Sequence, residues 1–275
     1  MPQRVGFTVP LVRVWWFAFV VGAYGGLSLL KSYPPFAYVP EIPVALDAVL
    51  SFAMALLIAF RVNRAYERWW EGRTLWGKLV NVSRNLAIKV RELQQPSSDD
   101  RRLIRDLIIS FCLGLKDHLR NDVDLTRLPG FDDDKATPSH LPSYVVKKLY
   151  GRFHDWQTDG TLSDEQLWIL DAEARSFLEV CGSCERIKMT PMPISWRLIT
   201  WQCIGVYLVV LPWGLVDDFG LWTIPLTILA AYLVIAAELI ARHVEEPFGL
   251  HEDHLDLERI CDSIDRSVSG LLLDD

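Results

Sequence analysis

The sequence of 275 residues has few cysteines, no excess of basic residues and no recognisable catalytic motif. Five cysteines are too few for a disulfide framework of the kind that stabilises small secreted domains. A net charge of −7 excludes a basic nucleic-acid-binding protein, and a hydrophobic fraction of 51% excludes a disordered chain. Because no Ser-His-Asp order, phosphate-binding glycine loop or redox motif stands out, we expect neither catalysis nor a nucleic-acid partner.

Four stretches contain almost no charge, and the first two contain one charged residue each. A helix needs about 20 apolar residues to cross a hydrocarbon core of about 30 Å. Helices in the core of a soluble domain are the alternative, but those alternate polar and apolar faces, and these stretches do not. The sequence therefore predicts an all-α integral membrane protein in a lipid bilayer, with four transmembrane helices per subunit at Leu11–Leu30, Ile42–Phe60, Leu198–Val216 and Leu221–Ala237.

Basic residues gather directly after the second of these stretches, at Arg61, Arg64, Arg68, Arg73 and Lys78. The positive-inside rule then predicts that both termini and the middle region lie in the cytoplasm. We expect four regions: transmembrane helices 1 and 2 in residues 1–60, a cytoplasmic helical domain in 61–195, transmembrane helices 3 and 4 in 196–242, and a cytoplasmic C-terminal segment in 243–275.

Helical periodicity and capping signals predict five helices outside the membrane. Ser98 or Asp99 is a candidate cap for the second of them, and Ser163 with Gln166 forms a capping-box-like signal for the fourth. The predicted helices span residues 61–93, 101–120, 143–158, 163–188 and 257–269.

The second apolar stretch has bulky side chains at i, i+4 and i+8, namely Phe52, Leu56 and Phe60. In one interpretation they face lipid while small residues face neighbouring helices. In the other, several copies of the chain surround an axis and the three residues form stacked apolar rings, which can gate ions by dewetting. Asp47 likewise has two interpretations, as a carboxylate at an outer pore entrance that concentrates cations or as a charge at the membrane interface.

Residues 60–77, FRVNRAYERWWEGRTLWG, resemble the signature that follows the second membrane helix of bacterial bestrophin homologues. The resemblance extends in order over nearly the whole chain. It includes the stretches 184–187 with 190–193, 211–214, and 246–249 with 255–257.

This resemblance implies a homopentameric ion channel of the bacterial inner membrane, with one axial pore for small monovalent ions. By resemblance Phe52, Leu56 and Phe60 line a hydrophobic neck, and Met192 lines a cytoplasmic aperture. The family suggests chloride conduction, whereas Asp47 and the net negative charge of the chain favour a sodium- or potassium-selective channel. A membrane scaffold that binds a cytosolic partner is the alternative from another class.

Animal bestrophins hold calcium in a clasp of consecutive aspartates after Pro-Phe-Gly. Here Leu250-His251-Glu252-Asp253-His254 follows Gly249, so we predict no calcium cofactor and no metal site. His251 and His254 could hold a metal, although a solvated turn is the simpler interpretation. Cys181 and Cys184 have redox or zinc spacing, but burial on a helix is expected instead.

Overall fold

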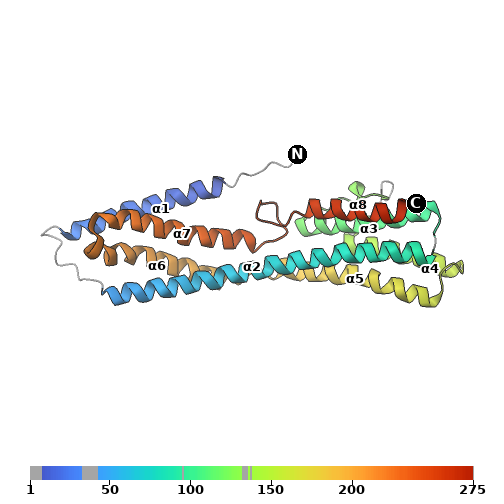
Figure 1. Cartoon of the computed structure of the whole chain (residues 1–275), viewed down its shortest axis with the longest axis horizontal. Coiled ribbons are helices and arrows are strands. Elements are labelled where there is room, and N and C mark those ends of the chain that lie inside the picture. Colours follow the sequence, from blue (N-terminus) through green and yellow to red (C-terminus); the bar gives the residue numbers. More distant parts are fainter. Residues whose placement is uncertain (1–7, 33–42, 95, 132–135, 137, 275) are drawn as a thin grey trace. The chain divides into compact units, whose positions relative to one another are not determined.

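The computed structural model describes residues 8–32, 43–94, 96–131, 136 and 138–274, and nearly all of them are helical (Figure 1). Within these residues there is no β-strand. The predicted all-α class is therefore confirmed. The chain divides into two compact units, and each is described by itself.

The first unit comprises residues 1–69, 191–246 and 251–253. Its helices are α1 (Thr8–Ser28), the first part of α2 (Val44–Lys89), α6 (Ile194–Phe219) and α7 (Thr223–Val244). Short 3₁₀ turns lie at Leu29–Ser32 and Gly220–Trp222. Helix α1 packs against α7 and α6, and α6 packs against α7 (Figure 1).

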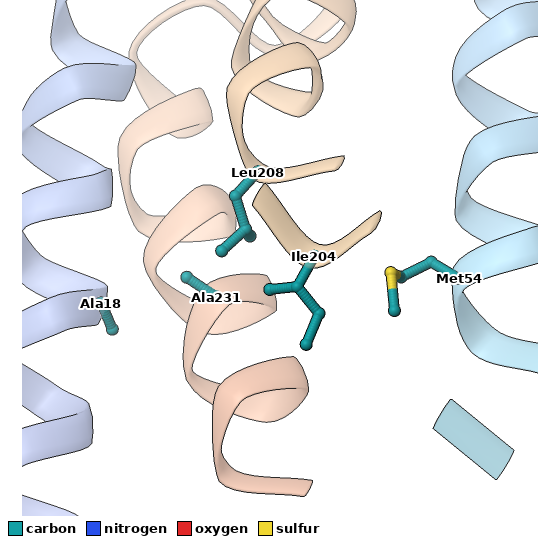
Figure 2. Packing of buried hydrophobic residues seen from close by; sticks show 5 residues of the cluster. All are labelled: Ala18, Met54, Ile204, Leu208 and Ala231. Carbon is teal, nitrogen blue, oxygen red and sulfur yellow. The ribbon is translucent and has the colours of Figure 1, made fainter. Parts of the chain in front are cut away.

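Five buried residues from the four helices form the apolar core of this unit, as Figure 2 shows. Ala18 of α1 and Ala231 of α7 have no exposed surface. Such small side chains let helices approach closely, which is how helices associate in lipid. Larger side chains fill the rest of the core: Met54 of α2 and Ile204 and Leu208 of α6 (Figure 2).

Three helical stretches are long and apolar enough to cross a membrane, judged by length and composition. They are Val14–Lys31, a part of Ala45–Gln94, and a part of Ile194–Val244, the stretch that contains both α6 and α7. The first unit also exposes large apolar side chains, for example Trp16 (67%) and Phe19 (61%). An apolar surface of this extent is unusual for a water-soluble domain. The count of four spans and their orientation stay predictions.

The second unit comprises residues 70–190, 247–250 and 254–275. It contains the rest of α2, which ends in a π-helical turn at Val90–Gln94, and a 3₁₀ turn at Leu125–Arg127. Helix α3 packs against α4, α5 and α8, and α4 packs against α5. The bounds of these helices are Ser98–Arg120 for α3, Leu141–Thr158 for α4, Asp164–Met189 for α5 and Leu257–Leu273 for α8.

Local capping decides where these helices begin. The capping box of α5 is confirmed, because Ser163 Oγ accepts from the Gln166 N–H and Gln166 Oε1 accepts from the Ser163 N–H. Ser97, rather than Ser98 or Asp99, caps α3 by accepting from the Asp100 N–H at 3.2 Å.

Three predicted helix ends were wrong. Helix α3 begins at Ser98 rather than Arg101, because Ser97 caps it. Helix α4 begins at Leu141 rather than Ser143, because His140 caps it and Pro142 fits in the first turn of a helix. Helix α8 continues to Leu273 rather than ending at Ser269, because Leu272 is still buried.

Candidate functional site

One face of α2 is apolar and exposed, and the opposite face is buried. Phe52, Leu56 and Phe60 are 72%, 45% and 56% exposed, whereas Met54 is 4% exposed and Ala65 is completely buried. Residues four positions apart share a helix face, so the three large side chains form a continuous row. We call Phe52, Leu56 and Phe60 the exposed stripe.

Arg61 follows the stripe directly and turns to the buried side of α2, where its side chain has no exposed surface. Its Nη2 lies 2.7 Å from Glu245 Oε2, and its Nε lies 3.2 Å from Glu238 Oε2. Both carboxylates are also almost completely buried. A buried cation paired with two buried anions is held in one orientation, because every other orientation leaves an unpaired charge out of water.

Glu245 joins four segments of the first unit. Its Oε1 accepts from Arg197 Nη2 at 3.1 Å and from the Met192 backbone N–H at 3.0 Å. Its backbone carbonyl accepts from Arg68 Nε at 3.2 Å. Burial acts to raise the pKa of this carboxyl, but the Met192 N–H and the guanidinium groups of Arg61 and Arg197 lower the pKa below its ordinary value.

Met192 is partly buried, and its Sδ accepts a hydrogen bond of 3.6 Å from Arg61 Nη1. The structure therefore connects Met192, through Arg61, to the end of the exposed stripe at Phe60. The sequence placed these two residues 132 positions apart, and the arginine between them brings their segments together.

Asp47 lies against α6 rather than on the exposed stripe. A Cβ atom built on Gly214 would be 3.0 Å from Asp47 Cγ, so the missing side chain at position 214 makes room for the carboxylate. Asp47 is partly exposed, and its place at an outer entrance stays a prediction.

Sequence reasoning missed the buried ionic cluster of Arg61, Glu238 and Glu245. In the sequence, Arg61 stands out only as one of the basic residues that predict how the chain is oriented in the membrane. Glu238 was the available signal, since it interrupts an apolar run of α7, and an acid in such a run usually has a charged partner.

For the cysteines and histidines that had two interpretations, the burial of each side chain decides between them. Cys181 and Cys184 are buried on α5 as predicted, and burial raises the pKa of the Cys181 thiol to about 12. His251 is exposed, as expected of a solvated turn, but that interpretation is wrong for His254. Its imidazole is buried, with its ring so close to Gly249 that a Cβ there would overlap it.

Comparisons with known proteins agree with this architecture. Residues 6–270 match the family model of bacterial and fungal bestrophins. A voltage-dependent anion channel-forming protein of Nostoc is 30% identical over 238 residues, which cover 83% of this chain and 78% of that protein. A protein of Salmonella typhi with the same description is 31% identical over 79% of this chain and 73% of its own length.

The solved structures show the same fold. A variant of a bacterial bestrophin homologue from Klebsiella pneumoniae has a TM-score of 0.86 at 23% identity, covering 95% of this chain and 98% of that one. The long apolar helices and this fold define a helical membrane protein. The chain belongs to the bacterial and fungal bestrophin family.

Proposed function

We propose that this chain is one subunit of a homopentameric channel in the bacterial inner membrane, which passes small monovalent anions such as chloride through an axial pore. The exposed stripe is the observation that carries the proposal. It presents three large apolar side chains on α2 that the rest of the described chain leaves 45–72% exposed. Five copies around an axis would turn them toward a shared pore.

In this arrangement Phe52, Leu56 and Phe60 form the neck of the pore. An ion that enters a narrow apolar throat loses part of its hydration, so conduction depends on whether the throat is wet. A small rotation of α2 changes which side chains face the axis and thereby changes the wetting. Met192 forms a second ring on the cytoplasmic side.

Arg61 supports this orientation of the stripe. Its pairing with Glu238 and Glu245 holds α2 in the observed orientation immediately after Phe60. The neck contributes no fixed charge, so the preference for anions rests on the relatives, which are described as anion channel-forming proteins. The protein then acts by conduction and not as an enzyme.

The experiment is a reversal-potential measurement on the purified protein in planar bilayers under a potassium chloride gradient. We expect the reversal potential to shift toward the chloride equilibrium value. A shift toward the potassium equilibrium value would instead indicate a cation channel of the same fold. Absence of current, together with a monomer or dimer in solution, would support a membrane scaffold.

A further inference from the structure

Three side chains that commonly bind metals converge in the second unit: His118 of α3, His140 at the start of α4 and Glu185 of α5. The Nε2 atoms of His118 and His140 lie 2.6 and 2.8 Å from the same oxygen, Glu185 Oε1. The candidate ligand atoms all lie within 4.8 Å of one another. The side chains are 21%, 33% and 23% exposed, so an ion can reach them from water.

The backbone positions of the three residues are set independently of any ion. Asn121 ends α3 in a left-handed conformation, close after His118. Lys188 of α5 donates to the His118 carbonyl at 3.1 Å and to Asn121 Oδ1 at 2.6 Å, which ties α5 to the end of α3. His140 is fixed as the cap of α4. The cluster is thus largely formed before a ligand arrives.

We propose that His118, His140 and Glu185 form a binding site for a zinc ion. Two imidazole nitrogens and one carboxylate oxygen are a known ligand set for zinc, with water in the fourth position. Calcium and magnesium prefer oxygen ligands and do not suit two imidazoles. Cys181 and Cys184, on the same helix as Glu185, are buried, and the group of converging ligand atoms does not include them.

Zinc binding has a structural cost at α4. The Ser143 N–H donates to His140 Nδ1 at 3.1 Å, so Nδ1 acts as an acceptor and the ring proton is on Nε2. Ligation through Nε2 moves this proton to Nδ1, which can then no longer accept from Ser143. Zinc therefore releases the side-chain cap of α4, and the nearby Lys188 ammonium opposes a second positive charge. We expect a reversible site rather than a permanently occupied one.

The site does not depend on channel activity and is tested by binding. Full-length protein in detergent is stripped with a chelator and titrated with zinc chloride in a calorimeter. We expect one zinc ion per chain. Cobalt(II), as a spectroscopic substitute, is expected to give the intense visible bands of tetrahedral coordination.

Two variants remove a ligand and keep part of the local hydrogen bonding. His140→Asn leaves a good helix cap but no imidazole. Glu185→Gln leaves an acceptor for the histidines but no charge. Each variant, and His118→Ala, is expected to weaken zinc binding roughly tenfold or more. If His118→Ala does not fold, the other two decide the question.

His154→Ala and His251→Ala are the matched controls, because both histidines are exposed and lie outside the cluster. They are expected to bind zinc like the parent protein. Zinc is also expected to speed hydrogen exchange at the Ser143 amide. Failure to bind zinc, binding that persists in His140→Asn and Glu185→Gln, or unchanged exchange at Ser143 would overturn the proposal.

Discussion

Arg61 Nη2 lies 2.7 Å from Glu245 Oε2, and neither side chain has any surface exposed to solvent. The pair joins α2 to the end of α7 in a place where water cannot solvate either charge. A pair of this kind contributes little net stability compared with two apolar residues, but removal of one partner leaves the other charge buried alone. The Arg61–Glu245 pair therefore fixes how α2 and the end of α7 are oriented more than it adds to the stability of the fold.

Replacement of Arg61 by methionine is expected to lower the free energy of unfolding by about 3–5 kcal/mol, because Glu238 and Glu245 then lack their shared cation. Denaturation of the detergent-solubilised protein measures this loss. Arg64→Met is the control, since Arg64 pairs with Glu67 on the exposed surface and is expected to cost at most about 1 kcal/mol. Equal losses for the two variants would contradict the importance of the buried pair.

The low pKa of Glu245 predicts how its contribution depends on pH. A carboxyl whose pKa is lower in the folded chain than in the unfolded one stabilises the fold above its ordinary pKa of 4.5. This stabilisation is lost as the pH falls further, through the folded pKa.

We therefore expect the stability difference between the parent protein and Glu245→Gln to be largest near neutral pH. The difference should shrink as the pH falls below about 4.5. Unfolding curves recorded at a series of pH values measure it. Glu67→Gln, at an exposed position, should show almost no difference at any pH. A stability difference for Glu245→Gln that stays constant as the pH falls below 4.5 would contradict the lowered pKa of Glu245.

Simultaneous replacement of Phe52, Leu56 and Phe60 by alanine is expected to increase single-channel conductance severalfold, because a wider and less apolar neck wets more easily. Planar bilayer recordings measure the change. The matched control replaces Phe17, Phe19 and Leu27 of α1, which are also exposed and apolar. Unchanged current in the first variant, or an equal increase in the control, would contradict the proposal that the exposed stripe lines the pore.

The buried thiols are expected to react slowly with maleimide at neutral pH. Burial raises the pKa of Cys181 and of Cys261 to about 12, so the thiolate fraction near pH 8 is about 10⁻⁴. Mass spectrometry should find Cys181 and Cys261 unlabelled after minutes in the folded protein and labelled after denaturation. Rapid labelling of Cys181 in the folded protein would show that this part of α5 opens in solution.

Much of the fold follows from local patterns in the sequence. The apolar stretches, the helical periodicity of residues 61–93 and the Ser163–Gln166 capping box each depend on residues near one another in the chain. The exposed face with Phe52, Leu56 and Phe60 could be predicted for the same reason, because the spacing of a helix alone places them together. The place of these residues in a pore stays a prediction.

The partners within the ionic cluster and the histidine cluster could not be predicted, because they are distant in the sequence. Arg61 and Glu245 are 184 residues apart, and His118 and Glu185 are 67 apart. Helical periodicity predicts which side of a helix is buried, but it does not predict which charged residue of a neighbouring helix contacts that side. Capping by a histidine is also uncommon, and for that reason the start of α4 was placed too late.

One of the contacts that hold residue 192 is made by its backbone, because the amide of Met192 donates to Glu245 Oε1. Every amino acid except proline has that amide. The segment can therefore keep this backbone hydrogen bond while its side chain changes, so in the proposed channel position 192 would be a place where the width of the pore can be adjusted. In the proposed channel, variants with side chains from glycine to tryptophan at position 192 are expected to change the pore width while keeping the backbone hydrogen bond to Glu245.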